Sequence, residues 1–291
     1  MVGLGNIGGA IAANLVADGH EVTVTDVDAD RAAAIEGAKA VSTVAEVAQA
    51  SEITITSLPN PTVVAAVAAE WADAAAKGTI LLDLSTTSPA SNREIAERLR
   101  SSGHFFVEAP LTGGAIGAQG RSLVFMVGGD DEPVARCVPV LDQLGRATIH
   151  LGPVGTGTTM KLANSLLAFS CTLASLEALS LAASAGIDLR TAVDVVRTAG
   201  VTNFFIDRGV EGINERGRPA QFTLDLAAKD AGLINELAEA SGVPPTVARA
   251  VAEALTDAVD RGLGERDWSD LVIAAEARAG LELRLGPAST A

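Results

Sequence analysis

The stretch Gly3-Leu4-Gly5-Asn6-Ile7-Gly8, at the start of the chain, decides the fold of its first half. In this spacing one glycine permits a tight turn, the next lets the backbone approach a pyrophosphate, and the third allows a helix to pack closely on a strand. The helix that follows would present free N–H groups and its positive dipole end to the phosphates. The turn therefore predicts a dinucleotide site, with cofactor contacts from Gly3, Gly5, Asn6, Ile7 and Gly8.

Asp26 has the position that this kind of site requires. An apolar strand is predicted over residues 21–26, and Asp26 ends it, eighteen residues after Gly8. A carboxylate at this spacing accepts hydrogen bonds from the adenine ribose hydroxyls. Asp26 and Asp28 would repel a 2′-phosphate, and Arg31 is the one cation near them in the sequence. Coulomb's law therefore favours NAD over NADP.

The strand before the glycine turn is unusually short, because Met1 and Val2 alone precede Gly3. Strands usually run about five residues. We expect further apolar residues upstream of Met1 in the native protein, completing the central strand.

Strand-like and helix-like patterns alternate through the first half of the chain and then give way to helical periodicity. Helices are predicted over 8–18, 28–37, 43–50, 61–76 and 89–102, with strands over 21–26, 40–41, 53–58, 79–84, 105–108 and 123–127. After Gly152 the apolar periodicities are helical, over 158–185, 188–199, 225–241, 246–261 and 269–278. The fold class is therefore α/β: a doubly wound, Rossmann-type parallel sheet, followed by an all-helical C-terminal domain. We expect an NAD-binding domain over 1–153 and a helical substrate and dimerisation domain over 154–291.

Composition excludes several classes of function. A net charge of −15 argues against a nucleic-acid partner, which needs a basic face. Cys137 and Cys171 lack metal-type spacing and lie in apolar stretches, so we expect buried structural thiols and no metal site. No secretory signal opens the chain, so a cytoplasmic location is expected.

One segment is long enough to cross a bilayer. Residues 162–187 contain a single charge, Glu177, which lies in the middle of the run. A central charge is costly in a membrane, and the segment also holds several serines and lacks basic flanks. A buried interdomain or subunit-interface helix is the favoured interpretation, with no membrane partner.

The residue that carries the chemistry can be sought by elimination. An alcohol that loses hydride also needs a proton acceptor. The chain has no tyrosine and lacks the Cys and His ligands of a catalytic zinc. His20 and His104 are predicted to be surface loop residues, and His150 is a lesser candidate near the domain boundary.

The four lysines, at 39, 77, 161 and 229, are more informative, because seventeen arginines supply the general surface charge. Lys161 begins the nearly uncharged helix, where desolvation favours the neutral amine that a base requires. A lysine that extends from the helix start into solvent is the alternative.

Five ordered blocks of sequence resemble the β-hydroxyacid dehydrogenases, which include 3-hydroxyisobutyrate dehydrogenase and tartronate semialdehyde reductase. They are GLGNIGGAIAANL at 3–15, SLPN at 57–60, DLSTTSP at 83–89, EAPLTGGAIGAQGRSLVFMVGG at 108–129, and GTGTTMKLANS at 155–165 with KD at 229–230. The resemblance covers essentially the whole chain. It implies a helical domain like that of 6-phosphogluconate dehydrogenase, built around a long central helix, and a homodimer or homotetramer formed through that domain.

The resemblance also implies roles for individual residues. Lys161 matches the catalytic acid/base, and Thr112-Gly113-Gly114 matches the loop that binds the substrate carboxylate, where glycines expose N–H groups and Thr adds a hydroxyl. Further cofactor contacts are implied for Leu58, Pro59, Thr86 and Lys229, and Lys229 would also close the site and attract the carboxylate. Asn164 and Ser165 match substrate-binding positions; the family commonly has Asn or Gln at the second of these.

The sequence thus predicts an NAD(P)-dependent oxidoreductase that moves hydride between a small 3-hydroxy acid and its semialdehyde or keto form. Two alternatives stay open. Imine reductases resemble the same fold but usually have Asp or Tyr in place of Lys161 and favour NADP. A catalytically silent dinucleotide-binding module would have no reason to keep Lys161 and Lys229 in so lysine-poor a chain.

Overall fold

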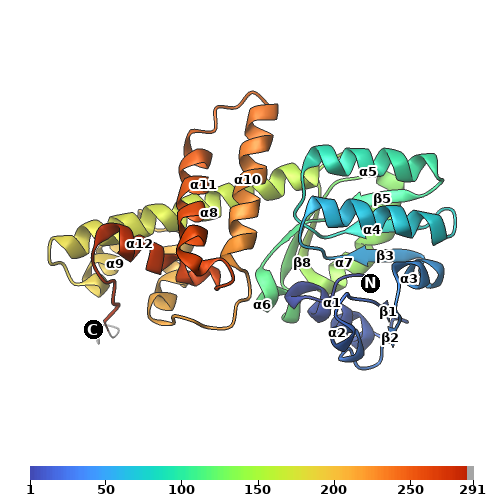
Figure 1. Cartoon of the computed structure of the whole chain (residues 1–291), viewed down its shortest axis with the longest axis horizontal. Coiled ribbons are helices and arrows are strands. Elements are labelled where there is room, and N and C mark those ends of the chain that lie inside the picture. The colour runs from blue at the N-terminus through green and yellow to red at the C-terminus, as the bar shows by residue number, and fades with distance from the viewer. Residues whose placement is uncertain (287–291) are drawn as a thin grey trace. The chain divides into compact units, whose positions relative to one another are not determined.

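The computed structural model describes residues 1–286 and divides into two compact units (Figure 1). Unit 1 is Met1–Leu162, and unit 2 begins at Ala163. The division falls inside the long helix α8 (Thr156–Ser184), whose first turns belong to unit 1. The domain boundary at 153/154 therefore remains a proposal, and residues 287–291 of the expected second domain lie outside the described residues.

Unit 1 alternates strands with helices, as the sequence predicts for residues 1–108; the two helices between residue 108 and α8 were not predicted. Its strands are β1 (Thr23–Val24), β2 (Lys39–Ala40), β3 (Ile53–Thr56), β4 (Ile80–Asp83), β5 (Phe105–Glu108), β6 (Leu111–Thr112), β7 (Leu123–Val127) and β8 (Gly145–His150). Its helices before α8 are α1 (Asn6–Ala17), α2 (Ala29–Ala33), α3 (Val44–Ala50), α4 (Pro61–Ala74), α5 (Pro89–Ser101), α6 (Gly114–Gln119) and α7 (Asp131–Leu144).

The strands up to β5 are parallel. β1 pairs with β2, and β3, β4 and β5 pair in that order. Val2 forms parallel bridges to both Thr25 and Thr56, so the start of the chain lies between β1 and β3. The predicted parallel arrangement is confirmed there, and the expectation about residues upstream of Met1 stays a prediction.

The sheet changes direction after β5, which the sequence patterns did not predict. β6 pairs antiparallel with β7, and an antiparallel bridge joins Glu108 to Gly128. β8 then pairs parallel with β7. β6 and β8 were not predicted, because β6 has two residues and β8 is largely exposed, so neither gives a clear apolar pattern.

Helices cover both faces of this sheet. Ile80 and Leu82 of β4 pack in a core cluster with Ile11 of α1 and Leu141 of α7. Residues from β4, α4 and α5 form the cluster on the other face, including Leu81, Trp71 and Leu99. The alternate residues of β4 thus pack on opposite faces, which explains its continuous apolar run and confirms the doubly wound fold.

The helices α4 and α5 begin with the same capping motif, shortly after β3 and β4 end. Asn60 caps α4, its Oδ1 accepting the Val63 N–H at 2.9 Å, and Pro61 follows at the first helical position. Ser88 caps α5 in the same way, ahead of Pro89. Short polar caps followed by proline begin a helix abruptly. The chain between strand and helix is therefore held at the carboxyl edge of the sheet.

Two side chains differ from the sequence predictions. His104 is not a surface residue: it is buried, with its ring edge-on to Trp71 at 5.1 Å between centroids. The prediction was wrong because the local Ser-Ser-Gly turn gave no sign of that packing. Cys137 is buried, and burial raises the pKa of its thiol to about 12. Cys171 is half-buried, so the expectation of a buried thiol was wrong there.

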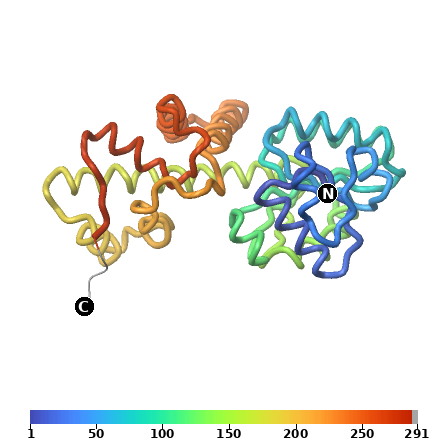
Figure 2. The backbone as a smooth tube through the Cα atoms, turned by 60° about the horizontal axis from the view of Figure 1, so that its bottom comes forward, coloured from blue at the N-terminus to red at the C-terminus, as the bar shows by residue number. Residues whose placement is uncertain are grey.

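The described part of unit 2 is helical, as predicted. Besides most of α8 it contains α9 (Leu189–Thr198), η1 (Phe205–Gly209), η2 (Val210–Asn214), α10 (Leu224–Ala240), α11 (Thr246–Ala258), η3 (Val259–Leu263), η4 (Trp268–Asp270) and α12 (Leu271–Ala279). Figure 2 shows the other helices gathered along α8. Phe169 of α8 packs on Trp268 at 5.0 Å between centroids, and Asn203 donates to Ser175 Oγ at 2.9 Å.

α8 is long and apolar enough to span a bilayer by length and composition alone, with a mean hydropathy of 1.7 in its most apolar window. One-third of that window is buried, 33%. The core helix of a soluble protein meets the same criteria, so this is weak evidence for a membrane span. The burial expected from the sequence holds for part of the helix surface, since Leu167 and Leu181 are 65% and 66% exposed.

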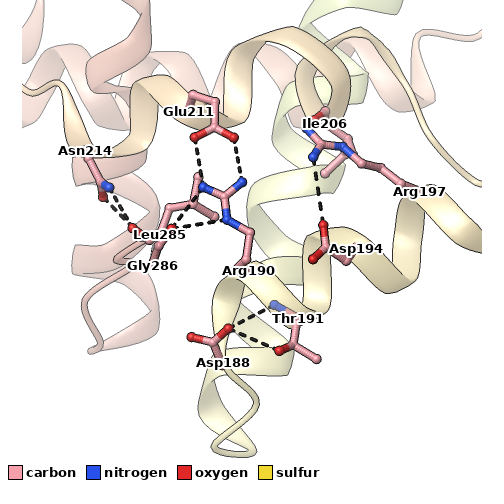
Figure 3. Close-up of polar contacts among 10 residues, drawn as sticks. All are labelled: Asp188, Arg190, Thr191, Asp194, Arg197, Ile206, Glu211, Asn214, Leu285 and Gly286. Carbon is pink, nitrogen blue, oxygen red and sulfur yellow. Dashed lines mark hydrogen bonds and ion pairs between the residues drawn. The ribbon is translucent and has the colours of Figure 1, made fainter. Parts of the chain in front are cut away.

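Hydrogen bonds of Arg190 and Asn214 join separate segments of unit 2 (Figure 3). Arg190 donates two hydrogen bonds to the Glu211 carboxylate, at 2.6 and 2.9 Å, and two more to the Gly286 carbonyl. Asn214 exchanges hydrogen bonds with the backbone of Leu285. Two parallel hydrogen bonds between a guanidinium and a carboxylate fix the relative orientation of the two groups, in addition to their charge attraction. Together these contacts hold residues 285 and 286 against η2.

Candidate active site

Two glycines of the turn are required by sterics within the chain. Gly3 has φ +86°, and a Cβ there would lie 2.3 Å from the Ser57 carbonyl oxygen. A Cβ at Gly8 would lie 2.0 Å from the Gly3 carbonyl oxygen. Gly5 differs, because a Cβ there would meet nothing within 4 Å. Gly3 and Gly8 therefore close the turn against the sheet, while Gly5 faces open space at the start of α1.

The residues of this turn fit a dinucleotide. α1 begins without a side-chain cap and has no acidic residue in its first turn. Uncapped N–H groups at the positive end of a helix attract an anion. The open space at Gly5 is where a pyrophosphate would approach the backbone. Asn6 and Ile7 form the first helical residues beside it.

Asp26 holds the glycine turn. Its two carboxylate oxygens accept the Leu4 N–H at 2.6 Å and the Asp28 N–H at 2.9 Å. Each oxygen keeps a second lone pair, so the carboxylate can still accept ribose hydroxyls. Arg31 Nε lies 3.3 Å from the Asp28 carboxylate. The nearby cation is thus paired with an acid rather than directed at a phosphate.

The loops after β3 and β4 are joined by hydrogen bonds. The Leu58 N–H donates to Ser85 Oγ at 2.9 Å, and Ser85 Oγ donates to Asp83 Oδ1 at 2.6 Å. Pro59 is exposed and Thr86 half-buried in these loops. Carboxyl ends of parallel strands meet at one edge, so these predicted cofactor residues share the edge that carries the glycine turn.

The predicted substrate loop follows β6, the two-residue strand that pairs antiparallel with β7. Thr112 ends β6 and is half-buried, while Gly113 and Gly114 are exposed and begin α6. Both glycines have positive φ, +123° and +63°, a conformation that other residues rarely adopt. A Cβ at Gly114 would meet nothing within 4 Å. The loop therefore presents its backbone to open space.

Lys161 lies on the second turn of α8 and is half-buried. The first turn of this helix is fixed by Glu108, the last residue of β5, whose Oε1 accepts the Gly155 N–H at 2.7 Å. Lys161 thus starts from the carboxyl edge of the sheet, within unit 1. Asn164 and Ser165 follow it by three and four residues, on the same face of α8. They belong to unit 2, and Ser165 is buried.

Lys229 lies on α10 in unit 2, with its ammonium 2.8 Å from the carboxylate of its neighbour Asp230. Asp230 is buried and Lys229 partly so. Its predicted contact with the cofactor and substrate is not tested by the structure of unit 2 alone.

Two buried acids at the sheet edge were missed by the sequence analysis. Asp83 and Glu108 are both fully buried and are register partners on β4 and β5. Burial raises the pKa of Asp83 to about 6, against hydrogen bonds from Ser85 and Thr56 that lower it. The signal was available, because each acid is the last residue of a short apolar strand, ILLD and FFVE.

Within residues 1–286, no group of three or more His, Cys, Asp or Glu side chains is arranged to hold a metal. An open cavity of about 630 Å³ lies beside Arg190 in unit 2, and none of the predicted site residues lines it. Its lining consists of Asp188, Arg190, Thr191, Asp194, Val195, Thr198, Ala199 and Gly286.

Comparisons with known proteins cover both parts of the chain. Residues 1–152 match the NAD binding domain of 6-phosphogluconate dehydrogenase, and residues 155–275 match the domain described as NAD-binding of NADP-dependent 3-hydroxyisobutyrate dehydrogenase. A mitochondrial 3-hydroxyisobutyrate dehydrogenase of Drosophila melanogaster is 32% identical, over 92% of this chain and 86% of that protein. The 2-(hydroxymethyl)glutarate dehydrogenase of Eubacterium barkeri is 31% identical, over 98% and 97%.

Solved structures agree with these relatives. The 3-hydroxyisobutyrate dehydrogenase of Mycobacterium tuberculosis, solved with L-serine, superposes with a TM-score of 0.86 at 29% identity, over 94% of this chain and 96% of that one. A Streptomyces aurantiacus imine reductase superposes with a TM-score of 0.64 at 23% identity, which shows a shared fold alone. The matches to both domains and to whole relatives show that this chain belongs to the β-hydroxyacid dehydrogenase family.

Proposed function

We propose that this protein is an NAD-dependent dehydrogenase that interconverts a small 3-hydroxy acid and its semialdehyde or keto form. The family consists of hydroxyacid oxidoreductases, so the proposal concerns the substrate, the choice of NAD and the residues. One observation carries it: Lys161 lies on the second turn of a helix whose first turn is fixed by Glu108 to the carboxyl edge of the parallel strands, the edge that also bears the glycine turn. An amine in that position can exchange a proton with a bound hydroxyl.

The proposed roles follow from the chemistry of each group. Thr112, Gly113 and Gly114 would hold the substrate carboxylate with a hydroxyl and backbone N–H groups. Lys229 would add attraction for that carboxylate, and Asn164 and Ser165 would orient the substrate. The nicotinamide, when bound, supplies the hydride acceptor. Lys161 Nζ, as a neutral amine, would accept the hydroxyl proton during oxidation and return it during reduction.

The charges around the ribose site support NAD. Asp26 and Asp28 are both acidic, and the ion pair to Asp28 occupies Arg31. A 2′-phosphate beside these carboxylates would be repelled. Among the relatives, the L-serine dehydrogenase of Pseudomonas aeruginosa is NAD-dependent, whereas Psf3, a structural neighbour at 21% identity, was solved with NADP+.

Replacing Asp26 with Asn is expected to weaken NAD binding about tenfold, because a charged hydrogen-bond acceptor is worth about 1.4 kcal/mol or more. The ratio of the Kd for NADP to the Kd for NAD should fall as well, because the charge that repels the 2′-phosphate is removed. Titration of each dinucleotide against the protein, followed by reduced-nicotinamide fluorescence, measures both constants. Asp30→Asn is the matched control, because it removes an equal charge on α2. Unchanged NAD binding in Asp26→Asn would show that this carboxylate serves the turn alone.

The activity is tested by a panel of 3-hydroxy acids with NAD and with NADP, followed by absorbance of the reduced nicotinamide. We expect oxidation of branched or hydroxymethyl-bearing acids, the class named for the relatives, and faster turnover with NAD. Reduction of cyclic imines with NADPH, without hydroxy-acid oxidation, would favour the imine reductase alternative. Tight dinucleotide binding without turnover of any substrate would favour the silent module.

We further propose that the enzyme is a cytoplasmic homodimer or homotetramer formed through the helical domain. Leu167 and Leu181 of α8 are 65% and 66% exposed, so the long apolar helix leaves large side chains uncovered within one chain. A second copy of the chain would cover them.

A further inference from the structure

We infer that Glu108 is a positioning residue for Lys161: its carboxylate fixes the first turn of α8, and thereby the place from which the lysine reaches the substrate. The inference rests on the proposed role of Lys161. Glu108 ends β5 and is 0% exposed. A buried acid costs free energy unless its oxygens are fully satisfied, so its partners show what it holds.

Both oxygens of Glu108 are occupied. Oε1 accepts the Gly155 N–H at 2.7 Å and the Thr158 N–H at 3.2 Å. Oε2 accepts Thr158 Oγ1 at 2.9 Å and Asn92 Nδ2 at 2.6 Å. Three of these four donors belong to the start of α8 and the residue before it. The free N–H groups at the start of α8 are therefore hydrogen-bonded by the side chain of Glu108, 47 residues before Gly155 in the chain.

Asn92 closes the arrangement into a ring. Its Nδ2 also donates to Thr158 Oγ1 at 2.9 Å, so Glu108, Asn92 and Thr158 are bonded pairwise. Thr87 Oγ1 donates to Asn92 Oδ1 at 2.8 Å and fixes the amide. All four side chains are 0% exposed. The ring joins β5, α5 and α8, which sets both the rotation and the axial position of the helix start.

Close backbone packing removes the remaining freedom. A Cβ at Gly157 would lie 2.3 Å from the Met126 carbonyl oxygen, and one at Gly128 would lie 2.4 Å from Glu108 Oε1. The first turn of α8 therefore packs on the end of β7 with no room for a side chain. A helix held by both a ring of hydrogen bonds and direct backbone contact cannot shift without breaking one of them.

Lys161 follows Thr158 by three residues, which is about one helical turn. Its side chain starts from a backbone position that the ring determines. Catalytic groups misplaced by about 1 Å can lose up to 100-fold in rate. The ring of Glu108, Asn92 and Thr158 therefore controls the rate of proton transfer without touching the substrate.

The test is Thr158→Val, which keeps the shape of the side chain and removes its hydroxyl. We expect kcat to fall roughly tenfold, within the range for a misplaced catalytic group, while the Kd for NAD stays unchanged. Thr158→Ser restores the hydroxyl and should recover most of kcat. The matched control is Thr54→Val, which also loses one fully buried hydroxyl in unit 1, bonded to Trp71 Nε1 at 2.8 Å. It should lower the melting temperature similarly and leave kcat unchanged.

Equal kcat values in Thr158→Val and Thr54→Val would overturn the inference. If Thr158→Val does not fold, Glu108→Gln replaces it, because the amide keeps an acceptor for the two backbone N–H groups; normal kcat there would also count against the ring. Competitive reductive methylation of the four lysines, read peptide by peptide, adds a measurement independent of turnover. We expect a changed labelling rate at Lys161 alone, and an unchanged rate would contradict the inference. A normal kcat in Lys161→Ala would instead refute the proposed role of Lys161 as the acid/base, on which this inference rests.

Discussion

Lys161→Ala is expected to lower kcat about a hundredfold or more, the usual scale for loss of a general acid–base. The variant should still bind NAD with its normal Kd, because the glycine turn and Asp26 are separate from α8. Single-turnover oxidation of the hydroxy acid, with NAD binding measured in parallel, separates the two effects. The control is Lys77→Ala, which removes an exposed lysine of unit 1 and should change neither.

A second substitution separates charge from proton exchange. Lys161→Arg keeps a positive charge, but a guanidinium does not deprotonate at accessible pH and cannot act as a base. Its kcat should therefore be close to that of Lys161→Ala. Recovery of activity in Lys161→Arg would mean that Lys161 acts through its charge on the substrate, and near-normal turnover in the alanine variant would remove it from the mechanism.

Most elements of the fold were predictable because their signals are local. The predicted helix over 158–185 appears as α8 (Thr156–Ser184), and that over 225–241 appears as α10 (Leu224–Ala240). Strand and helix periods, proline and polar caps act over a few residues, so they can be recognised in one sequence. The antiparallel pairing of β7 with β6 could not be recognised in this way, because the relative direction of two strands depends on long-range contacts.

In the candidate site, too, the residues with local sequence signals were predicted and those joined by long-range contacts were not. The glycine turn, Asp26 and the Thr112 loop follow local rules of spacing and backbone conformation. The Glu108 ring joins residues 92, 108 and 158, which no spacing rule connects. His104 is a smaller case, because its burial against Trp71 depends on how α4 packs on the sheet. Sequence reasoning thus found the groups proposed to meet the ligands and missed the groups that hold them in place.

Asp83→Asn is expected to change how stability depends on pH. Burial raises the pKa of Asp83 from 3.8 to about 6, despite hydrogen bonds from Ser85 and Thr56. The native state therefore binds this proton more tightly than the unfolded state does. Stability from this group is greatest below pH 4 and falls as pH rises through 6, by about 3 kcal/mol for a shift of about two pKa units.

Asn at position 83 can keep the native hydrogen bonds, and it does not titrate. Its Oδ1 can accept hydrogen bonds from Thr56 Oγ1 and Ser85 Oγ, which lie 2.7 and 2.6 Å from Asp83 Oδ1, and its Nδ2 would replace Oδ2, which is buried without a hydrogen-bond partner.

The measurement is urea unfolding from pH 4 to 7.5, at one protein concentration, followed by the fluorescence of Trp71 in a Trp268→Phe background. Relative to Asp83→Asn, the parent protein should lose about 2.4 kcal/mol across this range, because part of the total of about 3 kcal/mol is already lost at pH 4. Asp73→Asn, an exposed acid on α4, should leave the slope unchanged. Parallel slopes in parent and Asp83→Asn would mean that the buried carboxylate keeps an ordinary pKa, so the neighbouring Glu108 ring would experience its full negative charge even in mild acid.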